Sequence, residues 1–268
     1  MNNNDFEAQI KLYAIIREKL TPVETANWEE KFNIEYTHNS TAIEGNTCTL
    51  IETKMILEDK IAPAEKTLRE IDEIRFHYAA FQYVKANVKQ EIPLTEEVIK
   101  DIHERVLNVP GIGGIYRNIA VYINGAEHVP PNPKRVREYM KFFMDDLRTN
   151  KFADPIEKAA WIHAEFVKIH PFQDGNGRTA RLLMNYSLMS DGYPPTIIKK
   201  GNVREYFQSL ETYSLKGDLQ PFTGLLKRNL AKELDQFLHM YQHHIDIKEL
   251  THKDPHVLRY AQKIQANE

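Results

Sequence analysis

The strongest constraint on the fold is a series of helix start signals, each followed by apolar residues at helical spacing. Thr21-Pro22-Val23-Glu24 and Thr49-Leu50-Ile51-Glu52 have the pattern of a capping box, and Asn132-Pro133 and Asp154-Pro155 each place a capping side chain before a first-turn proline. Apolar stripes with a helical period follow these signals. We therefore predict an all-α fold with helices near residues 5–19, 22–44, 50–59, 64–88, 95–107, 133–149, 155–169, 176–190, 203–214 and 221–245.

One stretch departs from this helical pattern. Ile119-Ala120-Val121-Tyr122-Ile123 is a short β-like run, Asn124-Gly125 is a turn signal, and Val129 ends a second short run. The pattern predicts a small β-hairpin at about 119–131 within the helical bundle. A two-stranded hairpin is marginal alone, so it should pack on helices and leave one edge able to accept an extended peptide.

Composition excludes several classes of protein. With 268 residues and a net charge of −3, the chain has no excess of basic residues, and we expect no nucleic-acid partner. The single cysteine, Cys48, excludes an internal disulfide framework. Residues 1–5 lack the basic and apolar regions of a secretion signal, and no apolar run is long enough to span a bilayer. We expect a soluble, cytoplasmic protein without membrane contact.

Residues 170–181 combine the groups needed to handle a phosphate. His170 ends a predicted helix at Pro171 and supplies an imidazole that can take a proton near neutral pH, and Asp174 supplies a carboxylate for Mg²⁺. Asp174-Gly175-Asn176-Gly177 then leads into a helix whose amides can bind phosphate oxygens. Arg178 and Arg181 lie three apart, on one face of that helix.

Each of these residues also has an ordinary structural interpretation. His170 alone would be a helix end on the surface, and Asp174-Gly175 an ordinary turn before a helix. The coincidence of base, carboxylate, glycines and guanidiniums favours a phosphate site. Other motifs fail on spacing: a Ca²⁺ loop starting at Asp174 would need Glu at its twelfth position, where the chain has Asn185, and no Walker sequence is present.

The run at 170–181 matches the motif HPFx[D/E]GNGRxxR, and through it the chain resembles Fic-domain proteins, which mostly transfer AMP from ATP to protein hydroxyls. The resemblance covers about 22–230, with Tyr206 in its downstream part. It implies a Fic-type helical bundle whose hairpin at 119–131 is a target-binding flap. On this interpretation residues 1–21 and 231–268 are helical extensions of a Fic domain.

The resemblance also implies roles for individual residues. His170 would be the catalytic base, Asp174 would hold Mg²⁺, and the flap from Ile123 to Val129 would bind a segment of the target protein. The residues expected to contact ATP are Asp174, Gly175, Asn176, Gly177, Arg178, Arg181 and Tyr206.

Ser40-Thr41-Ala42-Ile43-Glu44-Gly45 resembles the inhibitory helix motif (S/T)xxxE(G/N) of some Fic proteins, within an inhibitory helix at about 36–45. Carried onto this chain, the motif implies that Ser40 and Glu44 restrain the enzyme, with Glu44 paired to Arg181. A carboxylate at a guanidinium competes directly with phosphate for the same donors. The ordinary interpretation of Glu44 is the last polar residue before a Gly45 helix end.

Three functions remain open on the sequence. The first is a self-restrained protein adenylyltransferase that modifies a Tyr, Thr or Ser hydroxyl of a target or of itself. The second is removal of AMP from a modified protein, which would require Glu44. The third is a nucleotide-binding interaction module without catalysis, and the intact His170 argues against it. The resemblance adds the expectation of a homodimer, and Ser214, where relatives often have Asn, leaves the nucleotide donor open.

Overall fold

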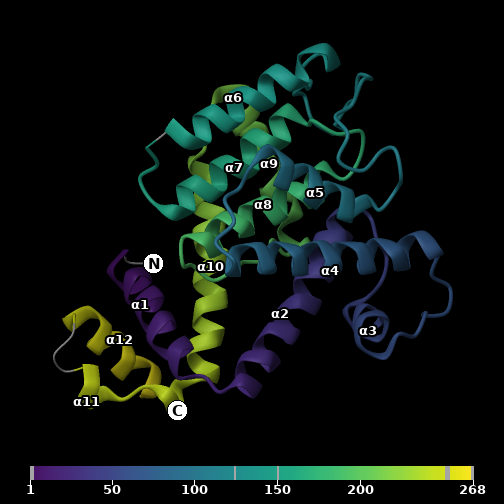
Figure 1. Cartoon of the computed structure of the whole chain (residues 1–268). Helices are drawn as coiled ribbons and strands as arrows, with labels where there is room; N and C mark the ends of the chain where they lie inside the picture. Colours follow the sequence, from purple (N-terminus) through teal and green to yellow (C-terminus); the bar gives the residue numbers. More distant parts are fainter. Residues whose placement is uncertain (1–2, 124, 150, 251–253, 267–268) are drawn as a thin grey trace. The chain divides into compact units, whose positions relative to one another are not determined.

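The computed structural model describes every residue except 1–2, 124, 150, 251–253 and 267–268 (Figure 1). The described residues form helices and connecting segments and contain no strand, which confirms the all-α class. The α-helices are α1 (Asn3–Lys19), α2 (Pro22–Ile43), α3 (Leu50–Lys54), α4 (Leu68–Lys89), α5 (Glu96–Leu107), α6 (Val136–Thr149), α7 (Pro155–Ile169), α8 (Asn176–Ser190), α9 (Val203–Lys216), α10 (Gln220–Met240), α11 (Ile247–Leu250) and α12 (Pro255–Gln265). Shorter helical turns are the π-helix η1 (Met55–Asp59) and the 3₁₀ turns η2 (Pro133–Arg135), η3 (Lys200–Asn202) and η4 (Gln242–His244).

The chain divides into two compact units. One unit combines Met1–Phe32 with Lys227–Glu268, and the other is Asn33–Leu226. Both boundaries fall inside helices, α2 and α10, and not at the ends of the expected Fic domain, residues 22 and 230. The two extensions expected at opposite ends of the chain therefore belong to the same unit.

The unit Asn33–Leu226 is built around α8. This helix buries almost every side chain from Arg178 to Leu188, because α7, α4 and α5 all pack against it (Figure 1). The inner face of α7 is apolar, since Ala159, Ile162 and Phe166 are fully buried. Burial on all sides fixes the position of the loop that precedes α8.

Local capping explains most helix starts. Thr21, Thr49, Asn132 and Asp154 all cap as the sequence predicted. A further capping box, between Thr67 and Glu70, starts α4 at Leu68 instead of at the expected residue 64. The capping side chain satisfies an amide that the helix leaves unpaired, and it therefore sets the first helical residue.

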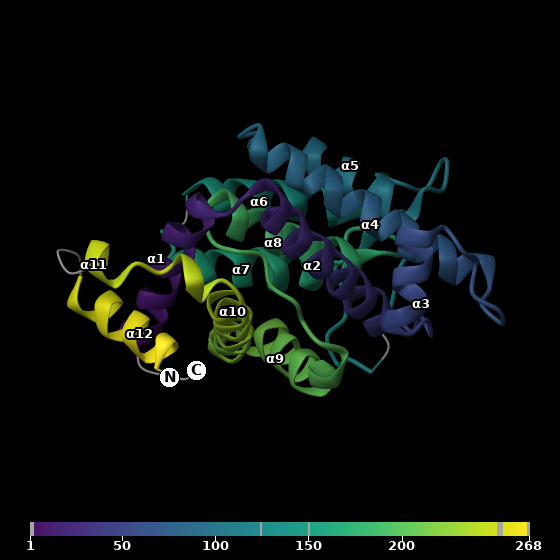
Figure 2. The same cartoon turned by 90° about the horizontal axis from the view of Figure 1, so that it is seen from below.

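In the other unit, α1 packs against α12 (Figure 2). Phe237 of α10 makes edge contacts with the rings of Tyr13 and Trp28 at centroid distances of 4.7 and 5.1 Å. The sequence predicted a helix to residue 245, but α10 ends at Met240 and the turn η4 follows. The helix α12, capped by Asp254, was not predicted.

The predicted β-hairpin at 119–131 is wrong for the described residues of this segment, which contain no strand. Its backbone groups bind mainly side chains, and one backbone bond within the segment joins the Ala126 amide to the Ile123 carbonyl at 3.1 Å. Arg117 donates to the carbonyls of Ile119 and Pro131, and the Glu211 carboxylate accepts from the amides of Glu127 and His128. The turn residue Asn124 lies outside the described residues, and Gly125 has a φ of 80°. Tertiary contacts have replaced the ladder that the local sequence favoured.

Among the described helices, none combines the length and the apolar character that a bilayer-spanning helix requires.

Candidate active site

The site begins where α7 ends. His170 adopts a left-handed conformation, with φ 50° and ψ 60°, and its amide donates to the Phe166 carbonyl at 2.9 Å. Pro171 cannot continue the helix, so the chain turns sharply at the histidine. A non-glycine residue in this conformation is uncommon and is held here by its surroundings. The turn places the imidazole at the mouth of the loop that leads into α8.

The His170 imidazole is neutral at physiological pH. Its Nδ1 lies 3.2 Å from the Val167 carbonyl, and because a carbonyl only accepts, Nδ1 carries the proton. Burial lowers the pKa of His170 to about 4. Nε2 is therefore the unprotonated nitrogen, which is the form that a general base requires.

Side chains of the loop after His170 and of the first residue of α8 hold this loop in place. Phe172 is fully buried. The Asn176 side chain bonds the Phe172 backbone twice, accepting from its amide and donating to its carbonyl, each at 2.9 Å. The Asn176 side chain therefore fixes the loop. Its contact with a phosphate stays a prediction.

His103 of α5 supports the same loop and was missed by the sequence analysis. It stacks on Phe172 with a centroid distance of 3.6 Å and an angle of 2°. Its Nδ1 accepts from the Gly114 amide, so Nε2 donates to the Asp174 carbonyl at 2.8 Å. Burial lowers the pKa of His103 to about 4. The available signal was a histidine beside Ile102, on the apolar face of the predicted helix.

Asp174 is an exposed residue of the loop. Its side chain is 64% exposed, and Oδ1 accepts from the Gly175 amide at 2.6 Å and lies 3.5 Å from Arg178. Mg²⁺ is commonly bound through one or two carboxylates together with substrate phosphates and water. A single exposed carboxylate beside the loop predicted to bind phosphate fits this donor set, and the role of Asp174 as a Mg²⁺ ligand stays a prediction.

The start of α8 presents amides without a side-chain cap. Gly175 occupies the N-cap position with a φ of 74° and has no side chain to accept from the first turn. Arg178, in that turn, is 4% exposed and lies 4.0 Å from Glu73. No described residue accepts a hydrogen bond from its Nε. Unpaired amides and a buried guanidinium together favour an anion at this point.

Residues at the C-terminal end of α2 and directly after it bind the Arg181 guanidinium. Its Nε donates to the Ser40 hydroxyl at 2.9 Å, and its Nη2 donates to the Ser40 carbonyl and to Glu44, each at 2.7 Å. The Arg181 side chain is 1% exposed and that of Glu44 is 37% exposed. The ion pair expected between Glu44 and Arg181 is present.

Glu44 also lies against Gly177, in the first turn of α8. A Cβ atom added at Gly177 would collide with Glu44 Oε1. The chain can bring the carboxylate this close because α2 ends at Ile43 and Gly45 turns with a φ of 98°. The Glu44 carboxylate therefore occupies space directly beside the first turn of α8.

Tyr206 lies behind Arg181. It is 1% exposed, its hydroxyl is 3.3 Å from Arg181 Nη1, and it is 3.0 Å from Nε2 of the fully buried His163. The described contacts of the hydroxyl are thus with Arg181 and His163. The contact of Tyr206 with a nucleotide stays a prediction.

Arg117 connects His170, the candidate general base, to the segment at 119–131. This residue was not identified from the sequence. Besides its bonds to that segment, it donates from Nε to the His170 carbonyl at 2.8 Å. Val129 is 63% exposed, and Ile123 is partly buried. Arg117 thus links this segment to the backbone of His170. Val129, in the same segment, is open to solvent.

Comparisons with known proteins agree with this site. The profile of the Fic/DOC family matches residues 93–188. The chain is 39% identical over 208 residues to the protein adenylyltransferase Fic of Drosophila willistoni, covering 76% of this chain and 41% of that protein. The chain is 38% identical over 227 residues to the protein adenylyltransferase Fic of Drosophila persimilis, covering 83% of this chain and 44% of that protein. The chain therefore spans about two fifths of the length of the curated relatives it matches.

Among solved structures, Fic-1 from C. elegans superposes with a TM-score of 0.76 at 30% identity, covering 88% of this chain and 72% of that one. A Fic domain containing signaling protein from Bacteroides thetaiotaomicron superposes with a TM-score of 0.77 at 25% identity, covering 95% and 98%. The chain belongs to the Fic/DOC family.

Proposed function

We propose that this protein transfers AMP from ATP to a Tyr, Thr or Ser hydroxyl of a target protein or of itself, and that Glu44 restrains the reaction. The observation that carries the proposal is a neutral His170 beside the uncapped start of α8, with Arg178 and Arg181 buried in the same helix. The names of the Drosophila relatives, protein adenylyltransferase Fic, support the same reaction.

In this mechanism His170 Nε2 accepts the proton of the target hydroxyl. The hydroxyl oxygen then bonds to the α-phosphorus of ATP, and the bond from that phosphorus to the bridging oxygen breaks. Pyrophosphate leaves with the bonding electrons. The bond from Nδ1–H to the Val167 carbonyl orients the ring and keeps Nε2 free for the proton.

The loop and the start of α8 would hold the phosphates. The amides after Gly175 face an anion without competition from a capping side chain, and Arg178 and Arg181 add positive charge. Asp174 would hold Mg²⁺, which neutralises phosphate charge when bound. Gly177 would permit close approach because it carries no side chain there.

Restraint follows from competition for Arg181. The guanidinium forms bonds to Ser40 and Glu44 through Nε and Nη2, so a phosphate would have to displace the Glu44 carboxylate. Like charges of carboxylate and phosphate beside Gly177 would also repel each other. Removal of Glu44 should free the arginine and the space beside the loop, while Ser40 still accepts from the buried charge.

A target segment would bind along residues 119–131. Three apolar side chains of this segment are exposed, namely Ile119, Tyr122 and Val129 at 48%, 79% and 63%. With no strand among its described residues, recognition would depend on these side chains and on the few open backbone groups. Because Arg117 links residues 119–131 to His170, a target segment bound along these residues would lie near His170.

The test compares label transfer from α-labelled ATP with Mg²⁺ among wild type, Glu44→Gly and Glu44→Gly/His170→Asn. Asparagine tolerates the left-handed conformation at 170, so the double variant should keep the loop. We expect strong labelling with Glu44→Gly, weak labelling with wild type and none with the double variant. Glu35→Gln, on the same helix and paired with Lys199, should behave as wild type.

Other outcomes would redirect the proposal. If none of these proteins labels itself or added lysate proteins while all bind ATP, transfer of AMP is wrong for this chain. If wild type, but not Glu44→Gly, removed AMP from a pre-modified target protein, the reaction would be removal of AMP. A homodimer and a reducing, cytoplasmic location also stay proposals, and the one cysteine, Cys48, is a buried free thiol.

A further inference from the structure

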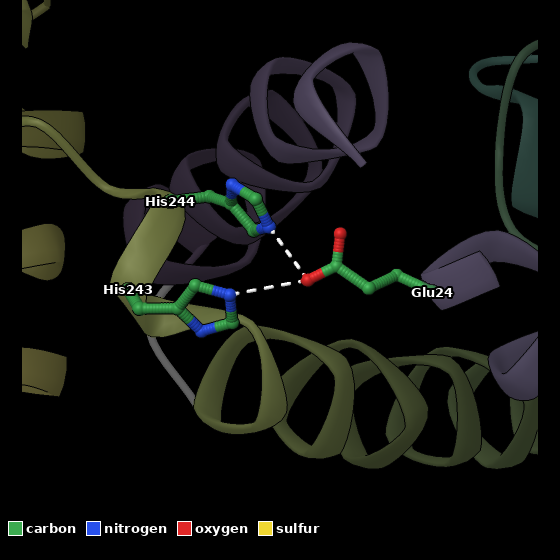
Figure 3. A group of neighbouring side chains, drawn as sticks. All are labelled: Glu24, His243 and His244. Atoms are coloured by element: carbon green, nitrogen blue, oxygen red, sulfur yellow. Dashed lines mark hydrogen bonds and ion pairs between the residues drawn. The ribbon is translucent and has the colours of Figure 1, made fainter. Parts of the chain in front are cut away.

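A second cluster of reactive side chains lies in the unit formed by Met1–Phe32 and Lys227–Glu268. Glu24, His243 and His244 each direct one possible ligand atom toward a common point, and these three atoms lie within 4.8 Å of one another (Figure 3). Glu24 is in the first turn of α2, and the histidines are in η4, more than two hundred residues later. We propose that this cluster is a Zn²⁺ site that joins the two chain segments of this unit.

The distances suit a tetrahedral ion. Nε2 of His244 lies 2.9 Å from Glu24 Oε1, and Nε2 of His243 lies 3.2 Å from the same oxygen. Ligands about 2.0–2.1 Å from zinc are separated by roughly 3.3 Å along a tetrahedral edge. Both separations are close to that value, and the two imidazole nitrogens lie within 4.8 Å of each other, so rotations of the side chains would bring all three ligands around one ion.

The donor set selects the class of metal. Two imidazole nitrogens and one carboxylate oxygen suit a transition metal such as zinc, whereas Mg²⁺ and Ca²⁺ prefer oxygen ligands alone. The side chain of His243 is 60% exposed, so water can supply the fourth ligand. The side chains of Glu24 and His244 are 24% and 20% exposed, which gives the site a partly enclosed floor.

Surrounding residues hold the ligands in place. The Thr21 amide and hydroxyl donate to Oε2 of Glu24, at 2.9 and 2.8 Å, and leave Oε1 directed at the histidines. The Tyr241 hydroxyl donates to the Glu24 carbonyl at 2.9 Å. The ring centroids of Trp28 and Tyr241 are 6.2 Å apart. Such bonds from neighbours orient metal ligands and raise metal affinity.

The role follows from chain connectivity. An ion at this cluster would close a loop of more than two hundred residues, and a link across a long loop restricts the unfolded chain. We therefore assign the ion a stabilising role that is independent of AMP transfer and of His170. A binding measurement tests the site without any activity assay.

The test titrates the metal-free full-length protein with ZnCl₂ by calorimetry and records the melting temperature with and without zinc. We expect one zinc per chain and a higher melting temperature for wild type, with affinity at least about tenfold weaker in His244→Ala and in Glu24→Gln. Glutamine keeps an oxygen for the Thr21 cap, so Glu24→Gln should remain folded. His239→Ala, which removes an exposed histidine 3.8 Å from Asp235, is the matched control.

Several results would overturn the site. These are no zinc binding by wild type, binding that survives both His244→Ala and Glu24→Gln, or binding that His239→Ala weakens equally. Far-UV circular dichroism of each variant shows whether it is folded. If His244→Ala were unfolded, His243→Ala would replace it, with the same expected loss of affinity.

Discussion

At the residue scale, Arg181 shows how one side chain can carry two roles. A guanidinium that is almost fully buried needs acceptors, since an unpaired buried charge is strongly destabilising. Ser40 and the Tyr206 hydroxyl can satisfy part of this need without charge, and Glu44 supplies the only carboxylate bonded to Arg181 among the described residues. The charged partner is therefore the exchangeable one, and a phosphate can take its place.

The protonation state of His170 is a direct prediction at this scale. Burial lowers its pKa to about 4, and the bond from Nδ1–H to Val167 fixes its tautomer. We expect an NMR titration of the His170 ring to show no transition between about pH 7 and about pH 5. A transition near pH 6.5 for His170 would contradict this.

His103 makes a second residue prediction. Replacing it by alanine removes its stacking on Phe172 and its bonds to the loop, and leaves a cavity beside Gly175. We expect His103→Ala to lower the free energy of unfolding by about 2–4 kcal/mol, measured with urea. His239→Ala should change it by less than about 0.5 kcal/mol. A loss of under about 1 kcal/mol for His103→Ala would mean that the loop does not depend on it.

At the element scale, the segment at 119–131 depends on side chains that belong to other parts of the chain. Arg117→Lys removes the planar fork that binds Ile119, Pro131 and His170 together. We expect faster amide hydrogen exchange across 119–131 and little change in α4, because α4 has its own capping box.

The control for this experiment is Arg135→Lys, which alters an exposed pair with Glu138 and should leave the exchange pattern unchanged. If Arg117→Lys exchanged like wild type, the contacts of Glu211 and the bond of the His128 ring to the Lys168 carbonyl would be holding the segment. The double variant Arg117→Lys/Glu211→Gln would then distinguish the two contributions.

The same scale explains what the sequence could and could not predict. Caps and periodicity are local signals, so the helices around His170 were predicted nearly to the residue. The hairpin was wrong because its β-branched run carried no information about Arg117 or Glu211. His103 was missed for the same reason, since its partners lie in loops distant in sequence. The pair of Glu44 with Arg181, 137 residues apart, was accessible only through resemblance to a family.

At the scale of the whole molecule, buried histidines link stability to pH. Burial lowers the pKa of His103 and His170 to about 4, and it lowers those of His77 and His163 well below their usual value. The unfolded chain binds more protons than the folded one below about pH 6.5, so the free energy of unfolding must fall as the pH falls from about 6.5 toward 4. Each of the two shifts to about 4 corresponds to roughly 2 kcal/mol of lost stability at pH 5.

We therefore expect the melting temperature to drop by several degrees between about pH 7 and about pH 5. The partly buried carboxylates Glu24 and Glu70, whose pKa values are lowered to about 2 by hydrogen bonds, lose their contribution only below about pH 4.5 and do not explain a change in this window. His103→Gln should reduce stability at about pH 7 yet lessen the further loss on acidification, because one titrating group is gone. A flat profile for wild type between about pH 7 and about pH 5 would show that burial does not lower the pKa values of these histidines.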